Sequence, residues 1–500
     1  MPERRLAWPL AALVALIGLA TWGLSASRAA LPVDPVAPPA IAARSTPRSE
    51  GVRWILAGGG PTPELNQVQI EQDLLLARDT LSPLGDGLLL YAGGADGNAV
   101  QVLREGAAAD PLRARLAELF DPRGGRDSSY RPSDLSPAGA ASAEAILEAV
   151  RGALGDSDAP LTVYLAGHGV GGEEPHLSQF LTWGADDLTV DDLAATLDEV
   201  PDHRPARFVV TACYAGGFAE IAFTAADPEE GPAASDRCGF FATTWDRAAA
   251  GCDPNPDRGA QEGYGIHFLH ALRGEDREGD DALDEIDLDG DGVVTLLEAH
   301  ARARIASGSL DVPVTTSERF LRAAAVDPEA VPDGELPPPH LPVERAVVAA
   351  LAERLGLDDP RDVSARLDAL HERADPLAER LDELEAELER VREVLAAELL
   401  HRWPVLDDPW HPDFGATLAA QRDAIEAHLE TSGAAAHEAE LLAEHALLAA
   451  EHDDLLADAA PMERLERALE TLALAAQLQA EGGTLWLRYL RFVACESGRL

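Results

Sequence analysis

Short apolar runs alternate with longer amphipathic segments between residues 51 and 325, and this alternation limits the possible folds more than any other feature of the sequence. Four of the runs are rich in Val, Ile, Leu and aromatic residues, as buried strands are: residues 52–57, 88–92, 161–166 and 208–212. Helical patterns cover residues 64–80 and 140–154 between them. A strand–helix alternation of this kind predicts an α/β fold, with a mostly parallel sheet sandwiched by helices.

Two of the predicted strands are followed directly by reactive side chains. His168 follows the third strand within the letters GHGVGG, and Cys213 follows the fourth within CYAGG. Because the carboxyl ends of parallel strands meet at one edge of a sheet, we expect these two side chains to converge. A thiol beside an imidazole is the arrangement of a nucleophile and its base, and the surrounding glycines leave main-chain N–H groups free to bind an oxyanion. The sequence therefore predicts a His168–Cys213 dyad.

The two strand-ending segments, LTVYLAGHG and FVVTACYAGG, resemble the His-Gly and Cys motifs of the caspase-like cysteine peptidases, the clan of caspases, legumains and gingipains. The resemblance is closest to bacterial legumain-like members. It implies a caspase-haemoglobinase fold over residues 51–325, an oxyanion hole made by the N–H groups of Gly169 and Cys213, and protein or peptide substrates. Legumains usually place an Asp just before the His and an acid two residues before the Cys. This sequence has Gly167 and Thr211 there, so legumain's preference for Asn is not carried over.

Residues 287–298 match the template of an EF-hand calcium loop. The template asks for oxygen ligands at loop positions 1, 3, 5, 7, 9 and 12 and for a glycine at position 6, which is Gly292 here. Bacterial peptidases of the resembling group often carry such a loop after the catalytic core. We therefore expect a structural Ca²⁺ site, the alternative being an acidic turn, and no organic cofactor. The expected ligands are Asp287, Asp289, Asp291, the carbonyl of Val293, Thr295 and Glu298.

The segment from residue 236 to 274 follows the nucleophile, and in the resembling families this region builds part of the pocket for the substrate side chain. Its acidic residues are candidates for binding a basic side chain, so we expect Arg at the P1 position of the substrate. The opposite arrangement, in which Arg237, Arg247 or Arg258 faces the pocket, would select an acidic residue. Solvated loop charges are the third alternative. The acidic candidates are Asp236, Asp246, Asp253 and Asp257.

The four cysteines are too few for a disulfide scaffold. Cys238 and Cys252 are close in sequence, and closing that loop of about 15 residues would stabilise the fold by ~3 kcal/mol in the chain-entropy model. We expect them to form a disulfide, the alternative being two free thiols.

The first 30 residues predict the compartment. Two arginines precede an uncharged run from residue 6 to 24, which is close to the ~20 residues that span a bilayer. Residues 1–30 are therefore predicted to be either a signal peptide or an N-terminal membrane anchor, and residues 31–50 a linker rich in Pro and Ala. The protein is expected to be exported: anchored in the inner membrane facing the periplasm, free in the periplasm, or secreted.

Beyond a Pro-rich linker at residues 326–345, the sequence becomes helical from 346 to 500. Apolar residues recur at spacings of four and three, which is a heptad seam. Asp375 and Pro376 resemble an N-cap and first-turn proline, and a second helical region over residues 417–478, broken near Gly433 and Pro461, could fold back on the first. The region is either a module for self-association or docking or a self-contained helical hairpin. The seam comprises Leu370, Ala374, Leu377, Leu381, Leu384, Leu388, Val391 and Leu395.

Net charge excludes one class of partner. The chain carries 40 basic and 88 acidic side chains, a formal charge of −48. Because affinity for nucleic acid comes largely from cationic contacts to phosphates, nucleic acid is not expected as a partner. Two functions remain: an exported, calcium-supported cysteine endopeptidase that works through a thioacyl-enzyme, or a catalytically silent caspase-like scaffold that acts through its coiled coil.

Overall fold

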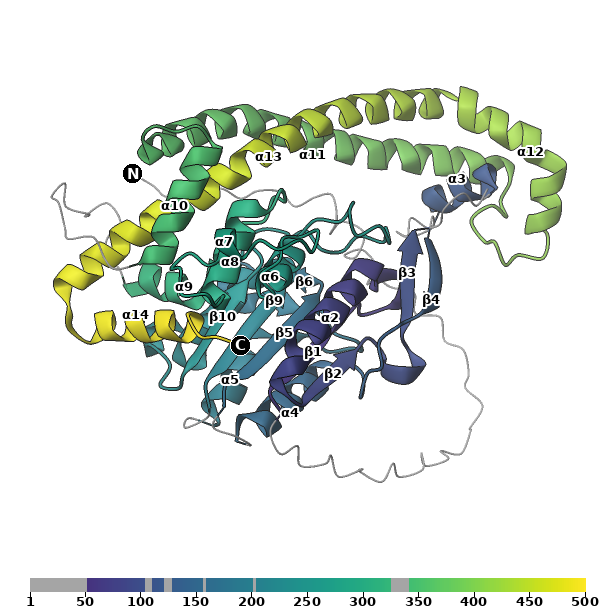
Figure 1. Ribbon diagram of the computed structural model, residues 1–500. Helices are drawn as coiled ribbons and strands as arrows, with labels where there is room; N and C mark the ends of the chain where they lie inside the picture. The colour runs from purple at the N-terminus through teal and green to yellow at the C-terminus, as the bar shows by residue number, and fades with distance from the viewer. Residues whose placement is uncertain (1–51, 104–109, 121–127, 156–158, 201–203, 325–340) are drawn as a thin grey trace, which may run out of the picture.

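A six-stranded β-sheet forms the centre of the protein (Figure 1). The computed structural model describes residues 52–103, 110–120, 128–155, 159–200, 204–324 and 341–500. The strands lie in the order β11-β10-β9-β5-β1-β2, and all neighbours are parallel except β10 and β11. The mostly parallel sheet is therefore confirmed. Its strands are β1 (Trp54–Gly59), β2 (Gly87–Tyr91), β5 (Leu161–Gly167), β9 (Ala206–Thr211), β10 (Arg237–Phe241) and β11 (Val314–Thr315).

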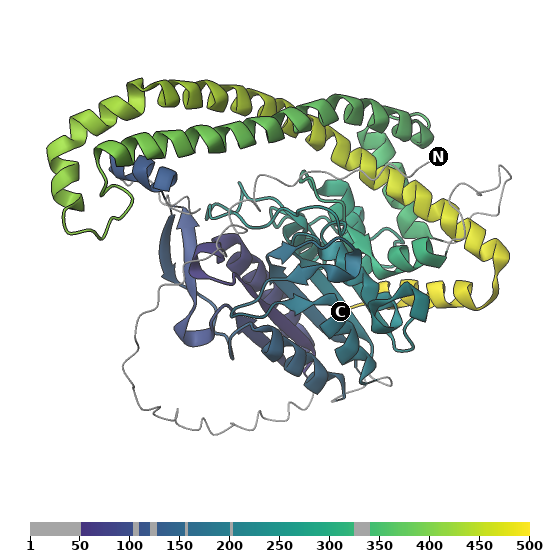
Figure 2. The ribbon, with the colours of Figure 1, turned by 180° about the vertical axis from the view of Figure 1, so that it is seen from behind.

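Helices cover both faces of the sheet, as predicted (Figures 1 and 2). Successive side chains of a strand point to opposite faces. In β1, Trp54 and Leu56 join the core that packs under one layer of helices, whereas Ile55 and Ala57 join the core under the other. The first layer contains α2 (Val68–Leu81), α6 (Tyr264–Ala271) and α8 (Leu296–Ala306); the second contains α4 (Ala143–Leu154) and α5 (Val190–Asp198).

The helix predicted over residues 64–80 starts later than expected. A short 3-10 turn, Pro63–Leu65, follows β1, and α2 begins only at Val68. Asn66 and Gln67 between them are not helical, and both are buried. Because this connection is irregular, the Leu65 carbonyl and the Gln67 side chain contact a side chain outside helix α2, as described below.

Smaller elements surround the sheet. Two of them, β3 and β4, form a separate antiparallel pair, and β6, β7 and β8 form a three-stranded sheet directly after His168. The remaining short elements are β3 (Ala99–Leu103), α3 (Pro111–Phe120), β4 (Ser128–Pro132), β6 (Gly169–Val170), β7 (Gln179–Phe180), β8 (Leu188–Thr189), α7 (Leu283–Ile286) and α9 (Thr316–Ala324).

Five helices form the C-terminal region, and two of them make a long antiparallel pair that extends beyond the sheet (Figure 1). Ion pairs between Arg380 and Glu444 and between Arg392 and Glu438 fix the antiparallel order of α11 and α13. The heptad seam of α11 therefore packs against a helix of the same chain, as a hairpin does, but the hairpin is not self-contained, because α10 and α13 share a core with the α/β unit. The helices are α10 (Pro342–Arg354), α11 (Val363–Arg402), α12 (Phe414–Thr431), α13 (Gly433–Glu481) and α14 (Gly483–Glu496).

Two expected helix boundaries in this region are wrong. α11 begins at Val363 and passes through Pro376, and α13 runs without a break through Pro461. A proline inside a helix removes one hydrogen bond and costs about 3 kcal/mol, which packing along two long paired helices can outweigh. The break before Gly433 is correct. α10 begins at Pro342, inside the segment predicted to be a linker.

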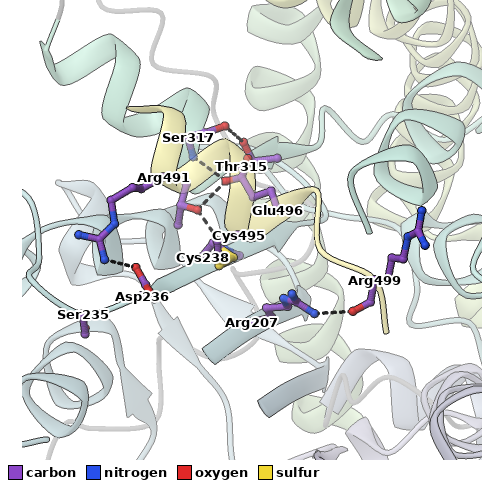
Figure 3. The surroundings of a disulfide bond; sticks show 12 residues. Arg207, Ser235, Asp236, Cys238, Thr315, Ser317, Arg491, Cys495, Glu496 and Arg499 are labelled. Carbon is purple, nitrogen blue, oxygen red and sulfur yellow. Dashed lines mark hydrogen bonds and ion pairs between the residues drawn. A yellow bond between two sulfur atoms is a disulfide. The ribbon is translucent and has the colours of Figure 1, made fainter. Parts of the chain in front are cut away.

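The helical region shares its core with the α/β unit. Val347 and Leu351 of α10 and Leu465 of α13 are fully buried in the same cluster as α2 and α8. At the other end, Cys495 of α14 forms a disulfide with Cys238 of β10 (Figure 3). The C-terminal helices are therefore an integral part of the fold.

The predicted signal or anchor and the linker after it, residues 1–50, lie outside the described residues, as does most of the second linker. Among the residues that the structure describes, no helix combines the length and the apolar content needed to cross a membrane.

Candidate active site

His168 and Cys213 leave the carboxyl edge of the sheet at equivalent positions because β5 and β9 are in register. The last registered pair of these parallel strands is Ala166 and Thr211, and each reactive residue lies two positions further along the chain, just beyond the end of its strand. His168 also lies where the strand order reverses, between β1 and β5, which is where open α/β sheets form their binding crevices. The two segments therefore leave the same edge of the sheet, and they touch where Gly169 packs against the carbonyl oxygen of Cys213, whereas the pairing of His168 with Cys213 as a dyad stays a prediction.

The imidazole of His168 is held by the irregular connection after β1. Its Nε2 atom lies 2.8 Å from the carbonyl oxygen of Leu65 and 2.8 Å from Oε1 of Gln67. Since both of these oxygens can only accept, Nε2 carries the hydrogen and the neutral ring keeps its lone pair at Nδ1. Burial lowers the pKa of His168, and the hydrogen bond to Leu65 opposes this shift only in part. The ring is therefore a neutral base at neutral pH.

The Cys213 thiol is surrounded by main-chain groups. The N–H of Ala249 donates to Sγ at 3.3 Å, and Sγ lies 3.7 Å from the carbonyl oxygen of the same residue. Burial raises the pKa of Cys213, while hydrogen bonds from the N–H groups of Ala249, Cys213 itself and Gly169 lower it. The thiol is therefore protonated at rest, beside three N–H groups that stabilise negative charge.

Gly169 contacts the Cys213 segment so closely that no other residue fits. A Cβ atom at Gly169 would lie 2.0 Å from the carbonyl oxygen of Cys213. The N–H groups of Gly169 and Cys213, the two predicted oxyanion donors, both lower the pKa of the Cys213 thiol. The next residue, Tyr214, has a positive φ of 58°, an uncommon conformation that is typical of strained turns at functional sites.

A cavity of about 490 Å³ lies near the turn that follows Cys213; Gly216 lines it, but His168 and Cys213 do not. One wall contains Gly216 and the loop from Thr244 to Arg247, whose last carbonyl accepts from the N–H of Tyr214. The C-terminal helices supply the opposite wall, through His371 of α11 and through Glu463, Glu466 and Arg467 of α13. Sequence reasoning missed this contribution, because nothing near residue 463 marks it as close to residue 213.

Of the four acidic pocket candidates, only Asp246 lines this cavity. Asp236 precedes β10, at the amino end of that strand, and forms an ion pair with Arg491 of α14. Its assignment to the pocket is wrong, because β10 separates it from the carboxyl edge. Asp253 accepts from the N–H of Asn255 and Asp257 from that of Gly259, as loop-capping groups do.

The three arginines that could have selected an acidic substrate are all engaged in ion pairs. Arg237 is fully buried and pairs with Asp198 at 2.8 Å, and Arg258 pairs with the buried Asp73. Arg247 lines the cavity, but it forms an ion pair with Glu463 at 2.6 Å.

The predicted Cys238–Cys252 disulfide is wrong. Cys238 lies near the amino end of β10 and pairs with Cys495, whereas Cys252 is a free cysteine whose Sγ lies 3.9 Å from the carbonyl oxygen of Gly167. The strand carries the chain from one end of the sheet to the other, so two cysteines that are close in sequence end up at opposite ends.

The predicted calcium loop brings three carboxylates together. One oxygen from each of Asp287, Asp289 and Asp291 lies within 4.8 Å of the others. Asp287 accepts from the N–H groups of Gly290, Asp291 and Gly292, which lowers its pKa and curves the loop around it. Oxygen donors of this kind suit Ca²⁺.

The other expected ligands are placed differently. Glu298 forms a capping box with Thr295, the N-cap of α8, and its second carboxylate oxygen accepts from the N–H groups of Leu288 and Asp289. Both carboxylate oxygens of Glu298 thus accept main-chain N–H groups, and Glu298 is not part of the cluster of Asp287, Asp289 and Asp291, so the expected bidentate ligand is not in place; Val293 is exposed.

Comparisons with known proteins add no assignment: no protein-family model matches the chain, and no curated protein matches it. A functional assignment therefore depends on the geometry at the carboxyl edge of the sheet.

Proposed function

We propose that this protein is an exported cysteine endopeptidase of the caspase-like kind, closest to bacterial legumain-like members, with His168 and Cys213 as its dyad. The observation that carries the proposal is the paired position of the two residues, each two places beyond the last registered pair of β5 and β9. The contact of Gly169 with the Cys213 carbonyl supports it, because it brings the main chains that carry the two proposed oxyanion donors together.

The protonation states suit attack by a thiol that loses its proton during the reaction. Nδ1 of the neutral His168 takes the proton from Cys213 as Sγ attacks the peptide carbonyl. The N–H groups of Gly169 and Cys213 bind the resulting oxyanion, and His168 then gives its proton to the departing amine. Water, deprotonated by His168, cleaves the thioester, releases the acid product and restores the thiol.

The cavity next to Gly216 favours a basic substrate side chain. Its four arginines are matched by four acidic neighbours: Arg247 pairs with Glu463, Arg319 with Glu220, Arg467 with Glu318, and Arg322 with both Glu318 and Glu470. Asp246 and Glu466 then remain as additional carboxylates in the lining. Arg is therefore the proposed residue at P1, and Asp or Asn are the alternatives.

The 287–298 loop is proposed to hold a structural Ca²⁺. Asp287, Asp289 and Asp291 would bind the ion, with Glu298 closing the loop. Bound there, the ion would neutralise part of the carboxylate repulsion at the start of α8.

The disulfide of the chain is consistent with the proposed export. The disulfide between Cys238 and Cys495 is of a kind that forms in oxidising compartments such as the periplasm or the extracellular medium.

Active-site labelling tests the proposal. We expect a peptide acyloxymethyl ketone with Arg at P1 to alkylate Cys213 of the full chain, and analogues with Asp or Asn at P1 to react more slowly. Peptide mass mapping locates the label. Cys213→Ala should show no label at this position and no peptide hydrolysis, and His168→Ala should react at least ~10³-fold more slowly. Cys252→Ser alters the other free thiol, and the label should stay at Cys213 in this variant.

Absence of labelling in folded wild-type protein would overturn the peptidase proposal and favour the catalytically silent scaffold. Faster labelling by the Asp or Asn analogue would overturn only the proposed P1 preference.

A further inference from the structure

One buried arginine of the C-terminal helices binds main-chain carbonyls next to the active centre. Arg464 of α13 is 1% exposed. Its Nε donates to the carbonyl oxygen of Asp311 at 2.7 Å and its Nη1 to that of Ser307 at 2.8 Å, and further contacts reach the carbonyls of Arg304 and Ser309. Because one guanidinium holds four carbonyls, it fixes the path of the whole 304–311 segment.

The last residue of that segment is Asp311, whose carboxylate contacts the 249–251 loop next to the Cys213 sulfur. Asp311 is fully buried. Its Oδ1 accepts from the N–H of Ala250 at 2.8 Å, and its Oδ2 accepts from the N–H of Tyr264 at 3.2 Å. A buried carboxylate that accepts two main-chain N–H groups links the 249–251 loop to the start of α6.

The residue before Ala250 is the one that contacts the thiol. The N–H of Ala249 donates to Sγ of Cys213 at 3.3 Å. A displacement of Ala250 would move Ala249, since the two share a peptide bond. A continuous set of contacts thus runs from Arg464 through Asp311 and the 249–250 peptide to Cys213.

We infer that Asp311 and Arg464 are positioning residues of the active centre, and that the C-terminal helical region keeps the Ala249 N–H directed at the nucleophilic sulfur. A catalytic role for these two residues rests on the proposed function. Their effect on the Cys213 thiol does not, and it can be measured without any substrate.

Two roles of Asp311 predict opposite changes in the pKa of Cys213. The Ala249 hydrogen bond lowers this pKa, whereas the charge of Asp311 raises it by a smaller amount. If Asp311 acts only as a nearby charge, Asp311→Asn lowers the pKa of the thiol. If it positions Ala249, the loss of that hydrogen bond outweighs the charge and the pKa rises.

The test measures the rate at which iodoacetamide alkylates Cys213 in the full chain as a function of pH, with peptide mass mapping to separate Cys213 from Cys252. We expect Asp311→Asn and Arg464→Lys each to move the midpoint of the profile upward. A shift of one unit makes alkylation below the midpoint about tenfold slower. Arg464→Lys keeps the positive charge and leaves Asp311 in place, so a rise in this variant reports positioning.

Matched controls come from the other end of the sheet. Arg488→Lys alters an arginine that also donates to carbonyls, those of Ala233 and Ser235, and Glu496→Gln alters a buried carboxylate that accepts from Ser317 and Thr316. Both should leave the alkylation profile unchanged. Near-ultraviolet circular dichroism checks that each variant is folded.

A downward or absent shift in folded Asp311→Asn, or an unchanged profile in folded Arg464→Lys, overturns the inference. Iodoacetamide requires no peptidase activity. A folded wild type without hydrolysis therefore refutes the proposed function alone, whereas unchanged profiles in an active enzyme refute the positioning role alone.

Discussion

The two ends of the central sheet are held together in different ways. At the carboxyl end, Leu65 and Gln67 contact His168 and Ala249 contacts Cys213 by hydrogen bonds, and Asp311 holds the neighbouring Ala250. At the amino end, the last residues of the chain are attached covalently and by charge, through the Cys238–Cys495 disulfide, Arg491 with Asp236, and Arg207 with the carbonyl of Arg499 (Figure 3).

This difference separates stability from reactivity. The groups that contact His168 and Cys213 directly are neutral, so the two candidate residues can gain and lose protons, whereas the cross-link at the amino end stabilises the folded state. Changes at the amino end should therefore alter the free energy of unfolding while the alkylation rate of Cys213 stays the same.

Loss of the disulfide should produce the largest such change. The cross-link joins residues 257 positions apart, for which the chain-entropy model gives about 5 kcal/mol of stabilisation. We expect Cys495→Ser to lower the free energy of unfolding in urea by ~2–5 kcal/mol. Cys252→Ser removes a free thiol at the opposite end and is the control for the loss of a sulfur atom. A change in the reactivity of Cys213 in folded Cys495→Ser would show that the two ends are coupled.

Calcium should also stabilise the contact between the end of the chain and the rest of the fold, by a smaller amount than the disulfide does. Arg499 forms an ion pair with Asp291 of the loop, and the carbonyl of Gly498 accepts from the N–H of Leu296, so the loop contacts the end of the chain. Ca²⁺ at 100 times its Kd should add about 2.7 kcal/mol and raise the Tm.

Asp287→Ala should abolish the increase with Ca²⁺. Asp284→Ala, which removes an exposed carboxylate on α7 outside the loop, should keep it. An equal Tm in chelator and in excess Ca²⁺ would mean that the loop binds no calcium and is only a turn.

The sequence predicted the elements that carry strong local patterns. Four strands of the sheet were predicted from runs of apolar residues, and the two reactive residues from their positions after such runs. β10 was missed because Arg237 and Cys238 interrupt its apolar pattern, although both are buried, and β11 is only two residues long.

Contacts between distant segments could not be predicted in this way. Gln67 is an ordinary polar residue before a helix until β1 and β5 bring it to His168. Asp311 and Arg464 are 153 residues apart and carry no local pattern that links them. The pairing of Cys238 likewise depends on where α14 packs, and proximity in sequence suggested the wrong partner.

The smallest predicted effect concerns the carboxyl group beside the disulfide. Glu496 is fully buried, and burial raises its pKa to about 7, although hydrogen bonds from Ser317 and Thr316 oppose the shift. An unfolded chain has a glutamate pKa near 4.3. Between these two values the folded protein holds a proton that the unfolded chain has released, so stability falls as pH rises from about 4.5 to about 7.

We therefore expect the wild type to lose ~1–3 kcal/mol more than Glu496→Gln between pH 5 and pH 7.5, measured by urea unfolding. Glu481→Gln, at the exposed end of α13, should behave like the wild type. Other buried carboxyl groups, including Asp311, titrate in all three proteins, so the difference between the variants isolates Glu496. If the stability of Glu496→Gln depends on pH as strongly as that of the wild type, the group that titrates in this range is not Glu496. A parallel change in Cys213 alkylation would show that the amino end does influence the reactive end.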